Sequence, residues 1–227
     1  MMRQDTDELI RRLVTYAQPV RPLPRPWSRA AVWLVYVLPY VGLMIFVLRP
    51  RDDLAAKMTD PRFVVEAATA LATGVAAAIA AFATVVPGYS RIPLAALLAP
   101  LAAWVGSLGA GCVQDWIQLG PEGLVLRTDW SCLPAILFTG AVPTIAMAAM
   151  LRRGAPLTPT LSMALGGLAA GALADFGLRF HHREAGVMVL VWHLGAVVLL
   201  LAAASKAGPY VLNWRAVVLA DRAASSG

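Results

Sequence analysis

Long apolar runs dominate the pattern of hydrophobic and polar positions along the chain. Six such runs are each bounded by charged residues or proline, namely Ala30–Leu48, Phe63–Val86, Ile92–Cys112, Cys132–Leu151, Thr158–Leu178 and Ala185–Ala204. An α-helix needs about 20 mostly apolar residues to cross the hydrocarbon core of a bilayer. The pattern therefore predicts an all-α, polytopic membrane protein built as a bundle of six transmembrane helices.

The composition agrees with a membrane location. Of the 227 residues, 59% are apolar and only 14% are charged, whereas about 25% are charged in soluble domains. A globular core of this size cannot hide that apolar excess. The net charge of +6 would suggest nucleic acid as the partner of a soluble protein, but membrane proteins collect Lys and Arg on cytoplasmic loops. We expect the lipid bilayer, and no nucleic acid, as a partner.

The distribution of charge predicts an orientation. Most Lys and Arg residues fall on the side of the six runs that also carries both termini, while most acidic residues fall on the opposite side. The positive-inside rule places both termini in the cytoplasm and the loop Gly111–Cys132 outside. The chain then divides into a cytoplasmic N-terminal segment (1–28), a transmembrane domain (29–206) and a cytoplasmic tail (207–227).

The N-terminal segment contains a short amphipathic pattern, "DTDELIRRLVTYAQPV". The spacing of Leu9, Ile10, Leu13 and Val14 places these side chains on one face of a helix. A helix of about three turns is marginal alone in water, so this face needs either the membrane surface or a groove on a cytoplasmic protein. The following "QPVRPLPRPW" is a stiff spacer that would hold the helix off the bilayer, which favours docking to a protein.

The only two cysteines, Cys112 and Cys132, lie at the two ends of the polar loop between the third and fourth runs. An oxidising compartment permits a disulfide if the Cα atoms lie within about 7 Å. Three interpretations stay open: a stapling disulfide, a redox- or metal-reactive thiol pair, and unpaired buried thiols.

A metal site is a further possibility for these thiols. Imidazoles from His181 and His182 could complete a tetrahedral set with two thiolates around a soft or borderline ion. The close C-x-x-C spacing of dedicated zinc sites is missing. We therefore expect transient capture of an ion such as cadmium or mercury, with no resident metal and no cofactor.

Ionisable residues inside the runs are functional candidates by default. His193 lies within the sixth run and Asp175 lies near the end of the fifth. The ordinary alternative is a neutral histidine bonded to a neighbouring helix, with local ion pairs at i and i+4 formed by Asp175 with Arg179 and by Arg62 with Glu66. The sequence shows no obvious relay among them.

Small residues in the fifth run predict close helix packing. Gly167 and Gly171 form a small-xxx-small pair, which lets two helix backbones approach. The pair could form a dimer face, but we expect it to pack within the bundle.

A set of motifs in a fixed order carries a resemblance to a known family. After "DELI" and "PVRPLPRPW" come "DPRFVVE", Cys112 with "DW", "WSCL", "LRRGAPLTP" and "VMVLVWHLG". In order and spacing these resemble the NrsF family of bacterial inner-membrane anti-sigma factors, over nearly the whole chain.

The resemblance implies a function and a partner. The N-terminal helix around Leu9, Ile10, Leu13 and Val14 would hold an extracytoplasmic-function sigma factor away from RNA polymerase. A heavy-metal or oxidative signal, sensed on the periplasmic side with Cys112 and Cys132 as the sensing positions, would release it.

Other functions are weighed against this one. No G-x-S-x-G, H-E-x-x-H or phosphate-loop motif is present, so the sequence gives no reason to expect an enzyme. The alternatives are a small transporter or channel, which would need a polar path, and a membrane thiol oxidoreductase, which usually needs a closely spaced cysteine pair.

Overall fold

A computed structural model describes residues 2–16, 23–121, 132–181, 187 and 189–213, and this part of the chain is helical without strands. Six of its helices are long and apolar enough to cross a membrane, so the predicted all-α six-helix bundle is confirmed. They are α2 (Pro26–Leu48), α4 (Pro61–Ala83), α5 (Ile92–Leu119), α6 (Cys132–Leu151), α7 (Pro159–Leu178) and a sixth span, Leu190–Val211, formed by the π-helical turn η2 (Val189–Leu194) and α8 (Gly195–Val211). Two shorter helices are α1 (Met2–Tyr16) and α3 (Leu54–Lys57).

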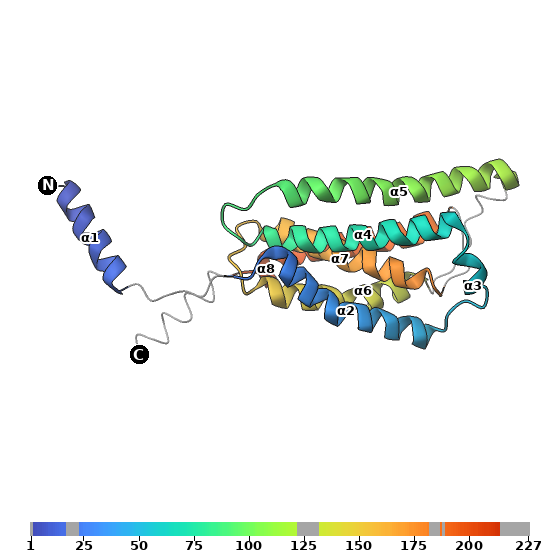
Figure 1. Cartoon of the computed structure of the whole chain (residues 1–227), viewed down its shortest axis with the longest axis horizontal. Coiled ribbons are helices and arrows are strands. Elements are labelled where there is room, and N and C mark those ends of the chain that lie inside the picture. Colours follow the sequence, from blue (N-terminus) through green and yellow to red (C-terminus); the bar gives the residue numbers. More distant parts are fainter. Residues whose placement is uncertain (1, 17–22, 122–131, 182–186, 188, 214–227) are drawn as a thin grey trace.

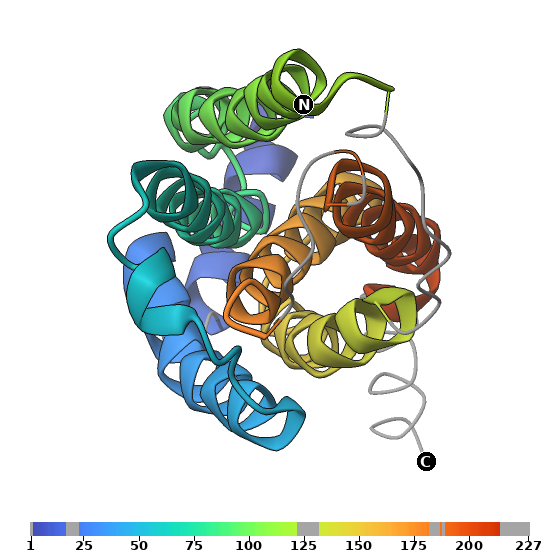
Figure 2. The same ribbon diagram turned by 90° about the vertical axis from the view of Figure 1, so that its right-hand side faces the viewer.

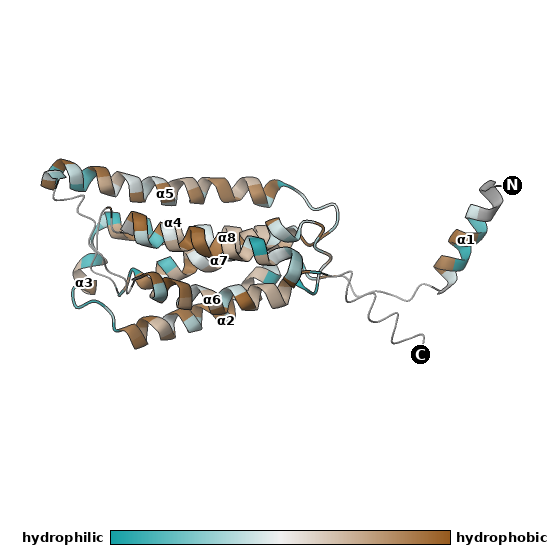
Figure 3. Cartoon of the chain, turned by 180° about the vertical axis from the view of Figure 1, so that it is seen from behind, coloured by the Kyte–Doolittle hydropathy of each residue, from teal (hydrophilic) through white to brown (hydrophobic). Residues whose placement is uncertain are grey.

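The bundle has two ends (Figure 1). The end from which the chain leads to α1 and to the C-terminus is called the proximal end here, and the end that carries α3 is called the distal end. Hydrophobic residues cover much of the helices between the two ends, and hydrophilic residues gather near the ends (Figure 3). This distribution fits a bilayer around the middle of the bundle.

Helix α7 lies at the centre of the bundle. It packs against α2, α4, α6 and α8, whereas α5 packs mainly against α4 at the edge (Figure 2). Most of α7 is buried inside the protein, and its mean hydropathy of 1.5 is the lowest of the six spans. A helix surrounded by protein needs no lipid-facing side chains, so small residues can replace large apolar ones.

Glycines on α7 bring α8 close. A Cβ atom on Gly167 would lie 2.8 Å from the Cβ of Ala204, and one on Gly171 would lie 2.9 Å from Cγ1 of Val197. The expectation that this pair packs within the bundle is confirmed.

Several helix ends differ from the prediction. The third run was expected to end at Cys112, but α5 continues to Leu119, because the charge of Asp115 is compensated by an arginine on α4, as described below. The sixth helix continues past Ala204 to Val211, since the exposed side chain of Lys206 can reach the headgroup region while its backbone stays helical. Helix α2 begins at Pro26, before the expected start at Ala30.

The early start of α2 carries Arg29 into the proximal end. Its side chain is buried, its Nη2 donates to the carbonyl oxygen of Met150 at 2.6 Å, and its guanidinium lies 4.6 Å from the ring centre of Phe82. Met150 lies in the last turn of α6, where carbonyl oxygens lack helical donors and a cation is favourable. Arg29 thus links α2 to the last turn of α6 by a hydrogen bond.

We predict that Gly171→Leu destabilises the bundle, because the added side chain has no room against Val197. Overpacking costs about 1–3 kcal/mol, and each kcal/mol lowers the Tm of a chain of this size by about 2–4 °C. Thermal unfolding of the purified protein in detergent measures the change. Gly42→Leu on α2 is the matched control, since a Cβ there meets nothing within 4 Å. An equal decrease in Tm in both variants would contradict close packing of α8 against Gly171.

Candidate functional site

Helix α1 presents an apolar face to its surroundings. The side chains of Leu9, Ile10, Leu13 and Val14 are 57%, 53%, 64% and 70% exposed, and α1 stands apart from the bundle (Figure 1). The helix is supported locally by an ion pair at i and i+4, in which Nε of Arg12 lies 3.2 Å from Oε1 of Glu8. The expected amphipathic helix is therefore present, with its apolar face available to a partner.

A second feature is a cluster of charged residues at the distal end, which we name the distal ion network. Its members come from four elements and are Arg62 and Glu66 of α4, Asp115 of α5, Asp175 and Arg179 at the end of α7, and His193 of η2. Contacts between these side chains join the four elements where each reaches the distal end.

Asp175 connects α7 to η2. Its side chain is fully buried, and its Oδ1 accepts a hydrogen bond from Nδ1 of His193 at 2.6 Å. Its Oδ2 lies 3.6 Å from Nε of Arg179, one helical turn further along. His193 is 2% exposed and lies in the π-helical turn, a distortion that is frequent at functional sites. The structure thus brings together the two intramembrane residues that the sequence singled out.

Glu66 connects α7 to α4. One of its carboxylate oxygens pairs with Nη1 of Arg179, and the other accepts a hydrogen bond from Nε of Arg62 at 3.1 Å. Glu66 is 5% exposed and Arg179 is 8% exposed. The two local pairs expected from the sequence are therefore confirmed. The contact of Glu66 with Arg179 joins them into one network, which was not obvious from the sequence.

Arg62 extends the network to α5. Its Nη1 donates to Oδ1 of Asp115 at 2.8 Å. A Cβ on Gly111 would meet the guanidinium of Arg62, so the glycine gives this side chain room to cross the surface of α5 and reach Asp115. The residue after Gly111 is Cys112, one helical turn before Asp115.

The start of α4 holds Arg62 in position. Pro61 is the first helical residue, which is a favoured position for proline, and Oδ1 of Asp60 accepts a hydrogen bond from the backbone nitrogen of Arg62 at 3.0 Å. Nζ of Lys57 donates to the other oxygen of Asp60 at 2.8 Å. That hydrogen bond holds the pKa of the Asp60 carboxyl below its usual value, so the cap stays ionised at neutral pH.

The predicted sensing residues have different surroundings. Cys112 is a half-buried free thiol inside α5, where a loop boundary was expected. Cys132 is the first residue of α6, but its side chain lies outside the described residues, as does His182 entirely. Nδ1 of His181 lies 2.7 Å from the carbonyl oxygen of Arg49. Within the described ranges, no group of three or more His, Cys, Asp or Glu residues could hold a metal ion.

Arg62, Glu66, Asp115 and Arg179 were not expected from the sequence to form one site. A usable signal was present, because both i, i+4 pairs lie near the distal ends of their helices: α4 begins there and α7 ends there. Because both pairs lie at the same level of the bundle, contact between the α4 pair and the α7 pair could have been predicted. The contact of Arg62 with Asp115 gave no such signal, since it depends on the continuation of α5 beyond Cys112.

We predict that Glu66→Gln lowers the free energy of unfolding by about 3 kcal/mol, because it removes the nearer of the two carboxylates that pair with the buried Arg179 and leaves Asp175 at 3.6 Å. Adding Arg179→Gln to the Glu66→Gln variant is expected to restore part of the loss, with a coupling energy of about 0.5–3 kcal/mol. Chemical denaturation of the purified protein measures both.

Glu8→Gln is the matched control for this cycle. It removes the exposed pair with Arg12 on α1, and such pairs contribute about 0–1 kcal/mol. Strictly additive effects of the two substitutions at Glu66 and Arg179 would show that these side chains do not interact energetically.

Comparison with known proteins identifies the family. The sequence model described as "NrsF: Negative regulator of sigma F" matches residues 13–214, which includes the last four residues of α1 and all six spans. The comparisons with curated proteins and with solved structures returned no match. Since the family match covers most of the chain, the protein belongs to the NrsF family, which makes it a membrane-spanning negative regulator whose partner is a sigma factor.

Proposed function

We propose that this protein holds an extracytoplasmic-function sigma factor at the inner membrane through α1 and releases it when a heavy-metal or oxidative signal reaches Cys112 and Cys132. The observation that carries the proposal is the exposed apolar face of α1, formed by Leu9, Ile10, Leu13 and Val14. A helix of this kind laid in a hydrophobic groove is a common mode of peptide recognition. The family membership supports a sigma factor as the protein that supplies the groove.

The proposed orientation places residues 1–28 and 207–227 in the cytoplasm and residues 29–206 in the inner membrane. Its support is the excess of Lys and Arg on the side of the termini. In this orientation the proximal end faces the cytoplasm, where α1 can meet a sigma factor. The distal end and Cys112 face the oxidising periplasm, where thiols react with oxidants and soft metal ions.

The distal ion network can transmit a structural change at Cys112 to the other helices of the bundle. Cys112 follows Gly111, over which Arg62 passes, and precedes Asp115, to which Arg62 binds. A bond formed at the thiol would alter the packing of α5 against α4 at this point. Because α5 packs mainly against α4, it can shift without breaking the other interfaces.

From α4 the change can pass to the centre of the bundle. Glu66 of α4 pairs with Arg179 at the end of the central helix α7, and Asp175 of α7 binds His193 of η2. Buried charges that exchange partners between two arrangements can form a bistable element that transmits signals. We propose that release of Asp115 from Arg62 shifts α4 and α7, and that this shift changes the availability of α1 at the proximal end.

We predict that Leu13→Asp in the full-length protein abolishes capture of the sigma factor and makes its target genes constitutively active. Removal of one buried leucine contact costs about 1.5–3 kcal/mol, which is a loss of affinity of roughly ten- to a hundredfold. Co-purification from membranes and a reporter of sigma-dependent transcription measure the two effects.

Thr15→Asp is the matched control, since it adds the same charge on the opposite face of α1, where Thr15 is exposed. Equal capture by the Leu13→Asp and wild-type proteins would refute binding through this face. Loss of sigma-factor capture in both Leu13→Asp and Thr15→Asp would show that binding is not specific to the apolar face.

We predict that Cys112→Ser keeps repression but loses induction by oxidant and by cadmium, and that Asp115→Asn activates the reporter without any signal while both thiols are intact. Asn cannot supply the charge that Arg62 binds, so the variant starts with this ion pair already released. Dose–response curves of the reporter measure induction. Gln118→Asn, at an exposed position on the same helix, is the control. Normal induction in Cys112→Ser would rule out sensing at this thiol.

A further inference from the structure

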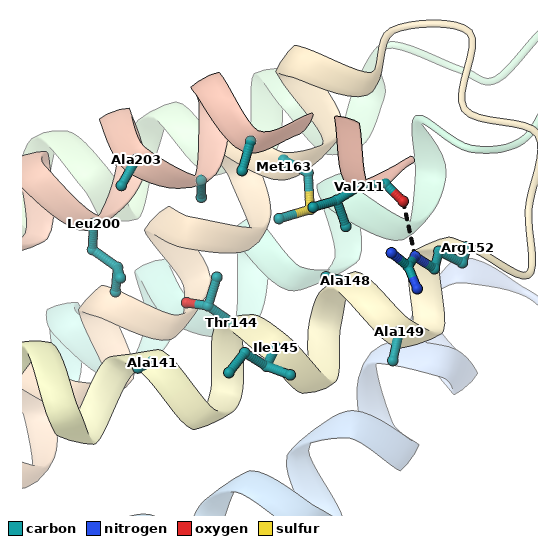
Figure 4. Close-up of a pocket in the computed structure, with 12 residues that line it drawn as sticks. Ala141, Thr144, Ile145, Ala148, Ala149, Arg152, Met163, Leu200, Ala203 and Val211 are labelled. Carbon is teal, nitrogen blue, oxygen red and sulfur yellow. Dashed lines mark hydrogen bonds between the residues drawn. The ribbon is translucent and has the colours of Figure 1, made fainter. Parts of the chain in front are cut away.

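A groove lies in the proximal half of the bundle, far from the distal ion network. It runs between α6 and α8, has a volume of about 460 Å³, and includes Met163 of α7 in its lining (Figure 4). Alanines form much of both walls, among them Ala141 on α6 and Ala203 and Ala207 on α8. Because these side chains are short, the two helices leave space between them. The volume falls within the range of small-molecule sites, about 300–1,000 Å³.

The groove is charged at its proximal end and mostly apolar along the rest of its length. The charged residue of its lining is Arg152, which follows the last residue of α6 at the proximal end (Figure 4). Its side chain is exposed, and its Nε donates to the carbonyl oxygen of Val211 at 2.8 Å. That bond fixes the guanidinium at the mouth and uses one of its five N–H donors. Thr144, a polar residue in the wall, directs its hydroxyl to the carbonyl oxygen of Gly140 on its own helix.

The length of the groove matches one leaflet of a bilayer. From Ala141 to Arg152 the lining follows α6, which corresponds to about 16 Å at a rise of 1.5 Å per residue. Half of the hydrocarbon core is about 15 Å. With Arg152 at the level of the headgroups, the other end of the groove reaches the middle of the membrane.

We propose that this groove binds an anionic phospholipid, with one acyl chain between α6 and α8 and the phosphate on Arg152. The guanidinium fork matches a phosphate group in charge and geometry, and basic sites between transmembrane helices recognise anionic headgroups. The alanine walls supply an apolar channel without competing polar groups. This site is independent of the proposed sensing at Cys112 and of sigma-factor binding by α1.

Native mass spectrometry of the purified full-length protein tests the proposal, with phosphatidylglycerol and phosphatidylcholine added in equal amounts. We expect the wild-type protein to retain one phosphatidylglycerol in preference to phosphatidylcholine. Arg152→Gln is expected to weaken this retention about fivefold, the value of one basic contact at a membrane surface. Ala207→Leu leaves Arg152 in place but fills the groove, and it is expected to abolish retention of the lipid.

Two controls separate the groove from general effects of charge and bulk. Arg91→Gln removes an exposed arginine at the same end of the bundle, and Ala103→Leu adds bulk at an exposed position on α5. Both are expected to retain the lipid as the wild-type protein does. Equal retention of the two lipids, an equal loss in Arg91→Gln, or unchanged retention in Ala207→Leu would overturn the proposal. A dimer that Ala207→Leu dissociates would assign the groove to a second copy of the chain and would overturn it as well.

Discussion

The ion pair between Glu66 and Arg179 is the contact on which the distal end of this protein depends. The two residues lie on helices that run in opposite directions, and both are nearly inaccessible to solvent. A charge in such a place costs several kcal/mol unless it is paired. Each member therefore needs the other, and each has a second neighbour in the network: Arg62 for Glu66 and Asp175 for Arg179. The position of α4 against α7 follows from these constraints.

The same constraint explains why α5 and η2 meet the bundle where they do. Arg62 fixes α5 through Asp115, and Asp175 fixes η2 through His193. Small residues on α7 let α8 approach closely along the middle of the bundle, and Arg29 fastens α2 to α6 at the other end. Between α6 and α8, Arg152 donates to the carbonyl oxygen of Val211 at the proximal end, and short alanines leave the groove. Ion pairs thus join the helices at the distal end, while the proximal end combines an open groove with an exposed α1.

Much of the fold was predictable, because the length of an apolar run is set by the thickness of the bilayer. Helix ends were less predictable wherever a charge was neutralised by a distant residue. Arg29 looked like a boundary residue, but a carbonyl oxygen and an aromatic ring on other helices allow it to be buried. The continuation of α5 through Asp115 has the same cause.

The candidate site was predictable only in part. Spacing in the sequence identified the face of α1 and the two i, i+4 ion pairs, since both are properties of a single helix. The link from Glu66 to Arg179 could have been inferred from the position of both pairs at the distal ends of their helices. The passage of Arg62 over Gly111 depends on how α4 and α5 pack, which no local pattern encodes.

The proposed mechanism requires that a change at Cys112 reaches α1 through the distal ion network. Hydrogen–deuterium exchange of the full-length protein in nanodiscs, with the sigma factor bound, is the sharpest test of this coupling. On addition of oxidant or cadmium, we expect faster exchange in α1 together with altered exchange at the distal ends of α4 and α7. A change confined to the segment around Cys112, with α1 still protected, would contradict it.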